Sequence, residues 1–269
     1  MQQLNVQSPQ ANAKAPRPDQ SKCKLKFDYS PSPDNVDLNL LILLHGLGDT
    51  KTPFAKLASK LKLPQTATLA IQAPEPIPYM EECYQWYPSF DVMTGHLLPP
   101  TNPQRMKGLT RTRQLITELL RHLIDDCHFQ PPNIFLFGFS QGGTVALDIA
   151  LLGSIRNLGG VVSISGYLLE EQASLDKQGN GYDGYILVTQ GEKDPTVGDK
   201  KEAEKKFQII KRFCASTAQT SQVFITNKGH SMPNGEGEWR VIHTFFSDYM
   251  PRRNLALENM SDVYLVNPS

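Results

Sequence analysis

Short apolar runs and longer amphipathic stretches alternate along most of this chain. The run at residues 38–44 is apolar almost throughout, as is typical of a strand buried on both faces of a sheet. Strands are predicted at 38–44, 66–71, 134–137, 160–165, 185–190 and 222–226, and helices at 53–61, 108–127, 144–152, 203–213 and 239–249. Such alternation predicts an α/β fold with a mostly parallel central sheet and helices on both faces.

The segments outside this pattern set the expected boundaries. Residues 1–22 are polar and rich in Gln, Asn, Ala and Pro, which predicts a disordered N-terminal tail. Residues 23–252 hold every predicted element and form one domain, and residues 253–269 are expected to be a C-terminal tail. Residues 72–107 are irregular and rich in proline and aromatic residues. Such stretches are often lids or binding loops, and the alternative is a surface excursion pinned by its aromatic side chains.

Composition and charge narrow the classes of function. The chain has 269 residues, 39% of them hydrophobic, with 27 basic and 27 acidic residues and a net charge of zero. This balance gives no electrostatic footprint for nucleic acid, so no nucleic-acid partner is expected. No apolar run approaches the ~20 residues of a membrane span, and the N-terminus lacks a signal-peptide core, which predicts a cytoplasmic protein. The four cysteines form no C-x-x-C pair, which predicts reduced thiols and no metal site.

One glycine-rich turn carries the strongest chemical signal. The strand predicted at 134–137 runs into Gly138-Phe-Ser140-Gln-Gly142 and then directly into a helix. This is the G-x-S-x-G pattern in the strand, turn and helix context that presents a serine nucleophile. A side chain at either glycine would collide with neighbouring backbone in so sharp a turn. Ser140 is the predicted nucleophile, and the alternative is a glycine-rich turn with an idle serine.

A serine nucleophile needs a base, usually an imidazole oriented by a carboxylate. Among the six histidines, His230 follows the last predicted strand, on a loop near the end of the chain. Asp194 follows the preceding strand, which gives the order Ser, Asp, His along the chain. Glu192 and Asp199 compete for the role of the acid, although Asp199 is better placed to cap the next helix.

A serine hydrolase also needs two N–H donors for the oxyanion that forms on the substrate. The residue after the nucleophile, Gln141, supplies one. The second is expected from Leu47, in the glycine-rich loop His45-Gly-Leu-Gly-Asp49 that follows the first strand. His45 is an alternative base by residue type, but its place before a glycine turn favours a role in orienting that loop.

The motifs His-Gly-Leu-Gly-Asp at 45–49, Gly-Phe-Ser-Gln-Gly-Gly at 138–143, Gln-Gly-Glu-Lys-Asp-Pro at 190–195 and Gly-His-Ser at 229–231 resemble one family. It is the acyl-protein thioesterase and lysophospholipase-type carboxylesterase family. The resemblance covers about residues 38 to 250 and implies an α/β-hydrolase catalytic domain that cleaves fatty-acyl thioesters or oxyesters without a cofactor. It implies a triad of Ser140, Asp194 and His230 with oxyanion donors Leu47 and Gln141.

The resemblance also implies substrate and partners. Family members carry Trp-Phe-Asp near the acyl site, and the longer Trp86-Tyr-Pro-Ser-Phe90-Asp91 stands here. Trp86, Phe90 and Met232 are the expected substrate-binding residues. The expected partners are acylated proteins or small lipid and ester molecules, with transient contact to a membrane surface. The alternatives are a small-molecule carboxylesterase or lysophospholipase with the same triad, and a non-catalytic binding protein on a hydrolase fold.

Overall fold

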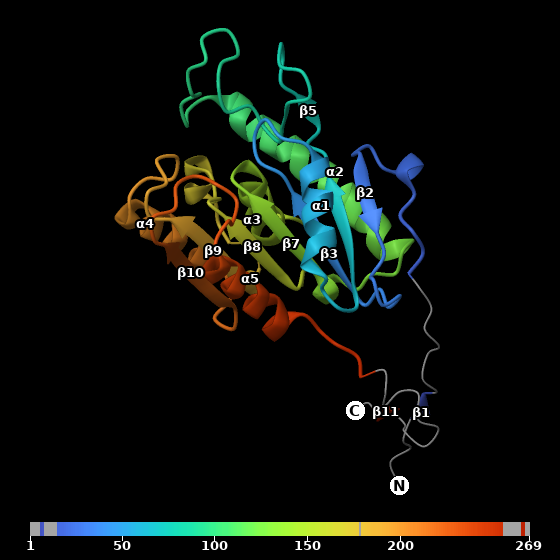
Figure 1. Cartoon of the computed structure of the whole chain (residues 1–269). Coiled ribbons are helices and arrows are strands. Elements are labelled where there is room, and N and C mark those ends of the chain that lie inside the picture. The colour runs from blue at the N-terminus through green and yellow to red at the C-terminus, as the bar shows by residue number, and fades with distance from the viewer. Residues whose placement is uncertain (1–5, 8–14, 178, 255–264, 267–269) are drawn as a thin grey trace.

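The computed structural model describes residues 6–7, 15–177, 179–254 and 265–266. Its main sheet has seven strands: β2 Phe27–Ser30, β3 Asn39–Leu44, β4 Thr66–Ile71, β7 Ile134–Phe139, β8 Gly160–Ile164, β9 Tyr185–Gly191 and β10 Gln219–Ile225. Their order is β10-β9-β8-β7-β3-β4-β2 (Figure 1). All neighbours run parallel except β2, which pairs antiparallel with β4 at one edge. The prediction of a mostly parallel sheet is confirmed.

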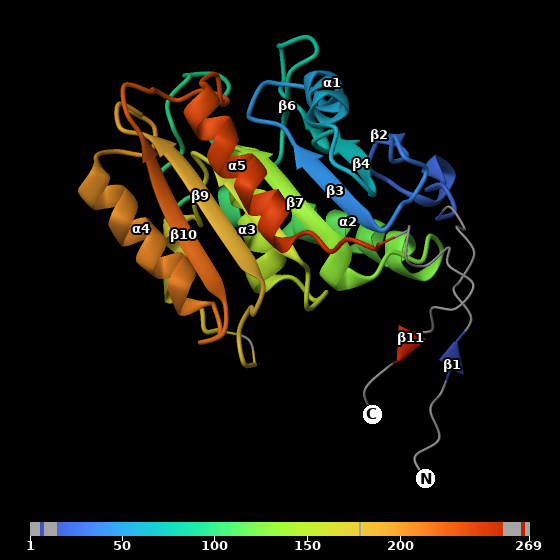
Figure 2. The same ribbon diagram turned by 60° about the horizontal axis from the view of Figure 1, so that its bottom comes forward.

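Helices cover both faces of this sheet, as predicted. They are α1 Lys51–Leu61, α2 Pro103–Asp125, α3 Gln141–Leu152, α4 Lys200–Arg212 and α5 Glu236–Tyr249. The side chains of α1 and α5 join one hydrophobic cluster, and those of α2, α3 and α4 join the other. Figure 2 shows α1 and α5 lying across the near face of the sheet.

The central strand β3 explains its own composition. All six of its residues are buried. Leu41 and Leu43 point into the cluster beneath α1 and α5, whereas Leu40, Ile42 and Leu44 point into the opposite cluster. A strand between two helical layers has no face in water, so its apolar run is continuous rather than alternating.

The region at 72–107 has more structure than the sequence suggested. The two-residue strands β5 Glu75–Pro76 and β6 Tyr84–Gln85 form a small hairpin. This hairpin and the loop after it project from the body near the start of α2 (Figure 1). Helix α2 begins five residues earlier than predicted, because the Asn102 side chain accepts the Gln104 N–H at 2.9 Å and Pro103 fits the first helical turn.

Both ends of the chain extend further onto the body than predicted. A 3₁₀ turn, Gln20–Lys22, is capped by Asp19, whose N–H donates to His122 Nε2 of α2 at 2.9 Å. Residues 19–22, part of the predicted tail, therefore contact the body through α2. At the other end, the Gln65 side chain donates to the Arg253 carbonyl at 2.8 Å.

Short elements complete the described chain. They are the paired strands β1 Val6–Gln7 and β11 Leu265–Val266, and the 3₁₀ turns Pro131–Asn133 and Glu170–Ser174. Residues 1–5 and 8–14 of the predicted N-terminal tail, and residues 255–264 and 267–269 of the predicted C-terminal tail, lie outside the described residues.

Candidate active site

Ser140 occupies the turn between β7 and α3 in a strained backbone conformation. Its φ of 52° and ψ of −118° lie outside the regions that non-glycine residues normally adopt. The Ser140 N–H donates to the Ile164 carbonyl at 2.8 Å, which ties the turn to β8. A Cβ on Gly138 would collide with the Gly142 backbone, and one on Gly142 would collide with the Leu44 carbonyl. The predicted reason for both glycines is confirmed.

The structure brings the three residues of the predicted triad together. His230 Nε2 lies 2.8 Å from Ser140 Oγ, and His230 Nδ1 lies 2.8 Å from Asp194 Oδ2 and 3.0 Å from Oδ1. Because an ionised carboxylate can only accept, the proton of the neutral ring belongs on Nδ1. Nε2 is then free to accept the Ser140 hydroxyl proton, as a general base requires.

Asp194 is held as an anion by several donors. Its Oδ1 also accepts the N–H groups of Thr196 at 2.9 Å and Val197 at 3.2 Å. Burial by itself would raise the pKa of Asp194, but the hydrogen bonds from His230 and the backbone, together with the nearby Ser165 side chain, hold that pKa below its usual value.

The two rival acids lie elsewhere. Asp199 caps α4, its Oδ1 accepting the Glu202 N–H at 2.8 Å, as the sequence indicated. Glu192 is exposed.

The predicted oxyanion donors lie at the same cavity as Ser140. Both Leu47 and Gln141 line this cavity. In the part of the chain that the structure describes, neither backbone N–H has a hydrogen-bond acceptor. Gln141 is also the first residue of α3, where unpaired N–H groups and the helix dipole favour negative charge.

His45 holds the Leu47 loop in place. Its buried ring accepts the Ala73 N–H on Nε2 at 3.0 Å, so Nδ1 carries the proton and donates to the Gly46 carbonyl at 2.7 Å. Burial lowers the pKa of His45, which keeps the ring neutral. The histidine therefore orients this loop, as its place before the glycine turn suggested.

The Gln141 side chain fixes the segment that enters the cavity wall. Its Oε1 accepts the Trp86 N–H at 3.1 Å, and its Nε2 donates to the Tyr87 carbonyl at 2.9 Å and to Ser89 Oγ. One buried residue thus offers its backbone to the proposed oxyanion and its side chain to the neighbouring segment.

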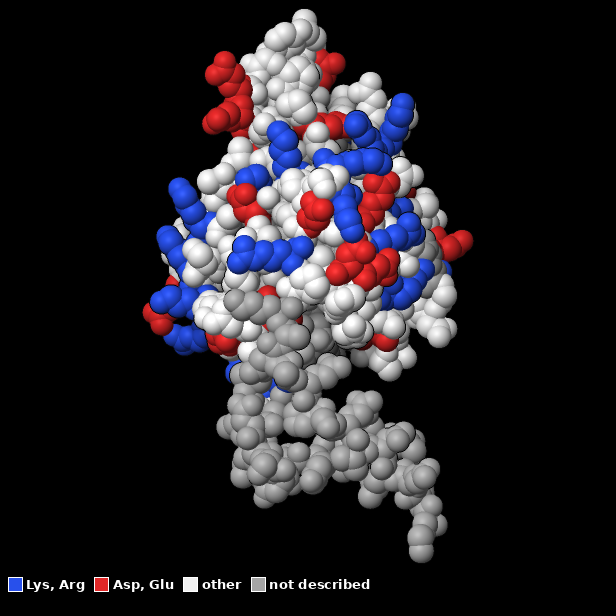
Figure 3. Space-filling model, turned by 90° about the vertical axis from the view of Figure 1, so that its right-hand side faces the viewer, with Lys and Arg blue, Asp and Glu red and all other residues white. Residues whose placement is uncertain are grey.

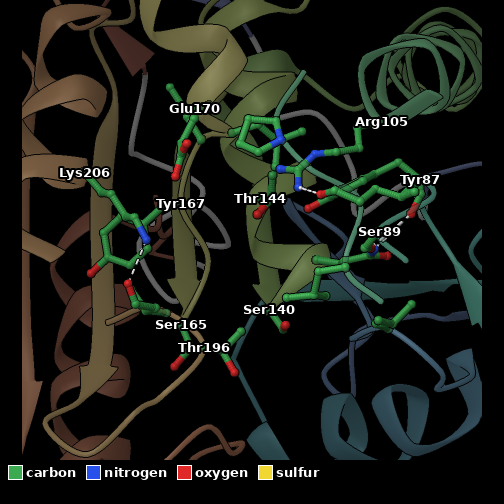
Figure 4. A pocket seen from close by; sticks show the side chains of 18 of the residues that line it. Tyr87, Ser89, Arg105, Ser140, Thr144, Ser165, Tyr167, Glu170, Thr196 and Lys206 are labelled. Atoms are coloured by element: carbon green, nitrogen blue, oxygen red, sulfur yellow. Dashed lines mark hydrogen bonds between the residues drawn. The ribbon is translucent and has the colours of Figure 1, made fainter. Parts of the chain in front are cut away.

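A cavity of about 480 Å³ opens beside Ser140 (Figure 4). This volume lies within the ~300–1,000 Å³ usual for small-molecule sites. Its apolar wall comes from Leu47, Tyr87, Leu97, Leu98, Pro99, Pro100, Tyr167, Leu168, Leu169 and Val197. Three charged residues, Arg105, Glu170 and Lys206, also line it. In the view of Figure 4, Arg105 and Glu170 lie on opposite sides with Thr144 between them.

The predicted substrate-binding residues do not line this cavity. Trp86 is 0% exposed, and its Nε1 donates to the His45 carbonyl at 2.7 Å, so it supports the oxyanion loop from behind. Phe90 pairs with Leu97 at the base of a loop, and Met232 packs against the cluster beneath α1 and α5. Trp86 is buried in the core and the cavity wall includes neither Phe90 nor Met232, so substrate contact by these three residues stays a prediction.

Several wall residues were not predicted from the sequence. Tyr167, Leu168 and Leu169 follow β8 at the carboxyl end of the sheet, where ligands of such folds bind. That position was the available signal. Lys206 gave no signal, because it lies in a helix whose pattern indicates only packing. Arg105 fell in the 72–107 stretch, which has no periodic pattern to show which of its residues face a cavity.

Three further properties of the described chain are its surface charge, its metal-ligating side chains and the apolarity of its helices. On the face in Figure 3, lysine and arginine side chains are interspersed with acidic ones. Among the described residues, no group of three His, Cys, Asp or Glu side chains could hold a metal ion. No helix in the described ranges is both long and apolar enough to span a bilayer.

The chain is similar in sequence to one protein family and to several known hydrolases. The sequence model of the phospholipase/carboxylesterase family matches residues 31–245. An uncharacterised hydrolase of Mycosarcoma maydis is 43% identical over 137 residues, which are 49% of this chain and 50% of that protein. Acyl-protein thioesterase 1 of Kluyveromyces lactis is 25% identical over 195 residues, 64% of this chain and 78% of that protein.

A solved structure agrees on the fold. The crystal structure of esterase PE8 superposes with a TM-score of 0.69 at 19% identity, covering 84% of this chain and 99% of that one. By contrast, the chain spans about half the length of the first two curated relatives it matches, 50% and 54%.

Proposed function

Because this chain belongs to the phospholipase/carboxylesterase family, we propose that it is a serine hydrolase of acyl thioesters and oxyesters. Its catalytic triad is Ser140, His230 and Asp194. The observation that carries the proposal is the unbroken contact from Asp194 through His230 to Ser140 Oγ, at 2.8 Å for each step. A binding protein on the same fold would have no use for this arrangement, which disfavours the non-catalytic alternative.

The proposed reaction has two steps. Ser140 Oγ attacks the acyl carbonyl while His230 Nε2 takes its proton, and the resulting oxyanion accepts the N–H groups of Leu47 and Gln141. Each such donor is typically worth ~3 kcal/mol of barrier. The thiolate or alcoholate leaves with the proton from His230. A water molecule, activated by the same nitrogen, then hydrolyses the acyl-enzyme.

The finer proposal is an acyl-protein thioesterase that removes palmitoyl groups from proteins. The name of the Kluyveromyces lactis relative and the apolar part of the cavity wall support it. A cytoplasmic location, a role in lipid metabolism and transient contact with a membrane surface belong to the same proposal. Cell fractionation and sedimentation with phosphatidylcholine vesicles test the location and the membrane contact.

The second candidate is a carboxylesterase or lysophospholipase that acts on small esters. Three charged residues in the cavity wall, Arg105, Glu170 and Lys206, favour this candidate. Charged side chains interact better with a polar substrate than they do with a long alkyl chain. The triad is the same in both candidates, so only the substrate distinguishes them.

Two measurements test the proposal. A fluorophosphonate, which reacts with activated serines, should label Ser140 in the native protein and should not label the Ser140→Ala variant. Acyl thioesters and matched oxyesters of increasing chain length should then be hydrolysed by wild type and not by this variant. A maximum at long thioesters supports the thioesterase, and a maximum at short oxyesters supports the carboxylesterase. Hydrolysis unchanged in Ser140→Ala would overturn the assignment of the nucleophile.

A further inference from the structure

A second serine, Ser165, lies at the carboxyl end of the strand next to Ser140. It follows β8 directly, and its N–H donates to the Thr189 carbonyl of β9 at 2.8 Å. Ser165 is 4% exposed and lines the cavity. Figure 4 shows it on the same side of the cavity as Thr196, one of the residues whose N–H groups hold Asp194.

Two features of Ser165 are energetically unfavourable: its backbone conformation and the lack of a partner for its hydroxyl. Its φ of 51° lies in the left-handed region, which is strained for a non-glycine residue and which glycine would adopt freely. Its buried Oγ has no hydrogen-bond partner in the described structure. Strain and an unpaired buried hydroxyl at one position of a cleft indicate a functional constraint.

Ser163, two residues earlier on β8, shows the ordinary alternative. Its Oγ is also buried, but it donates to the Gly166 carbonyl at 2.9 Å. Ser163 thus shows that a buried serine on this strand, in a packing role, pairs its hydroxyl with a backbone carbonyl.

The carboxylate of Asp194 can accept one further hydrogen bond, and it is the acceptor that we consider for the Ser165 hydroxyl. The carboxylate oxygen Oδ1 already accepts the N–H groups of Thr196 and Val197 and contacts His230. Among the described residues, His230 is the hydrogen-bond partner of Oδ2, so this oxygen can accept a further hydrogen bond. The hydroxyl of Ser165 also contributes to the lowered pKa of Asp194, after burial and the hydrogen bond from His230.

We propose that Ser165 is a positioning residue of the triad, whose hydroxyl donates to Asp194 Oδ2 as the imidazolium of His230 forms. The inference rests on the proposed function, since it assigns Asp194 the role of the triad acid. With this donor, both carboxylate oxygens are fixed and the carboxylate keeps one orientation while His230 gains and loses its proton. Without it, the carboxylate rotates more freely and its charge attracts the Nδ1 proton more strongly.

The experiment compares Ser165→Gly with Ser163→Ala. Glycine adopts the positive φ without strain and removes the hydroxymethyl side chain, so the variant should fold at least as stably as wild type. Ser163→Ala removes a buried hydroxyl from the same strand and reports the cost of a purely structural loss. The readouts are kcat and KM for a short p-nitrophenyl ester between pH 5 and pH 9, and the titration of the His230 ring by NMR.

In Ser165→Gly, we expect kcat to fall roughly three- to tenfold, the equivalent of one hydrogen bond, with KM unchanged. The His230 titration and the acidic limb of the rate profile should both move upward by roughly half to one pH unit, because a less solvated carboxylate favours the imidazolium. Ser163→Ala should lower the melting temperature and leave both titrations in place.

The outcomes separate this inference from the proposed function. An inactive wild type whose His230 titration still moves in Ser165→Gly would overturn the function and support the link from Ser165 to the dyad. An active Ser165→Gly variant with unmoved titrations would overturn the inference alone. A raised KM with unchanged kcat would also overturn it, because Ser165 would then contact substrate rather than Asp194.

Discussion

Two buried carboxylates in this molecule look alike and differ in what they do. The side chains of Asp194 and Asp148 are both 0% exposed, and each is paired with a basic side chain. Asp148 lies within α3 and accepts a two-pronged contact from Arg113 at 2.7 and 2.6 Å, with Gln172 donating at 2.5 Å. Burial raises the pKa of Asp148 even with these donors, whereas the pKa of Asp194 is lowered.

The difference comes from where each carboxylate sits. Asp148 connects three helical elements, α2, α3 and the 3₁₀ turn Glu170–Ser174, and within the described ranges its donors are the side chains of Arg113 and Gln172. Asp194 lies on a loop, and two backbone N–H groups stabilise its charge in addition to His230. We infer that the first pair serves stability and the second serves proton transfer, and each variant below tests that division.

The largest expected effect is on activity, from Asp194→Asn. We expect the asparagine to turn its NH2 group, a donor, toward His230 Nδ1. The ring then has no acceptor for its Nδ1 proton and should lose the tautomer that places the Nε2 lone pair toward Ser140. In serine proteases, replacing the triad aspartate by asparagine lowers kcat by roughly 10⁴-fold, and a similar loss is expected here. Steady-state hydrolysis of an acyl ester measures it.

The melting temperature of the same variant provides the control. It should fall only by the few degrees that correspond to one or two lost hydrogen bonds. An Asp194→Asn protein that keeps most of its kcat, or that fails to fold, would place Asp194 with Asp148 as a structural residue.

Arg113→Met should have the next largest effect, and on stability alone. It leaves Asp148 buried without its charged partner, which typically costs about 3–5 kcal/mol of unfolding free energy. Arg113 does not line the cavity beside Ser140, so the folded fraction should keep its kcat. Urea unfolding and active-site titration with a fluorophosphonate measure the two quantities separately. A stable variant, or one that is folded and inactive, would contradict the division.

The sequence predicted the part of the site that strands and turns define. The G-x-S-x-G turn needs glycine for steric reasons, so Ser140 could be found from local sequence alone. Asp194 and His230 followed from their places after parallel strands, whose carboxyl ends must meet at one edge. The topology therefore converts order along the chain into proximity in space.

The cavity wall could not be predicted in the same way. The family resemblance placed Trp86 near the acyl site, yet its indole is buried and bonded to the His45 carbonyl. Whether an aromatic side chain faces a cavity or the core depends on the path of an irregular segment, and residues 72–107 have no periodic pattern to fix that path. Arg105 lines the cavity from the first turn of α2, which begins earlier than its apolar spacing indicated.

A smaller effect is expected when the charge of Asp148 is removed as well. In Arg113→Met/Asp148→Asn, the buried group is neutral and can still accept the Gln172 amide. The double variant should therefore be more stable than Arg113→Met by about 2 kcal/mol. No such rescue is expected at the triad, where Asp194→Asn/His230→Phe should be as inactive as either single variant. Urea unfolding of the four proteins of the Arg113 and Asp148 cycle measures the coupling, and additive losses would show that the two residues act independently.

The smallest effect, and the one that compares the two carboxylates most directly, is the pH dependence of stability. Because the pKa of Asp194 is lower in the folded than in the unfolded chain, the unfolded chain binds its proton more tightly. The stability that Asp194 adds relative to Asn is then full above about pH 4, its unfolded pKa, and is lost as the pH falls through the folded value.

For Asp148 the folded pKa is raised, so the folded chain binds the proton more tightly and the sign reverses. The stability of wild type relative to Asp148→Asn should decline as the pH rises from about 4 through that folded value. Urea unfolding of wild type and both variants from pH 3.5 to pH 7 should give two differences, each about 1 kcal/mol, with opposite slopes. Slopes of the same sign would mean that burial and donors balance alike at both sites, and the division between a carboxylate for chemistry and a carboxylate for packing would have to rest on activity alone.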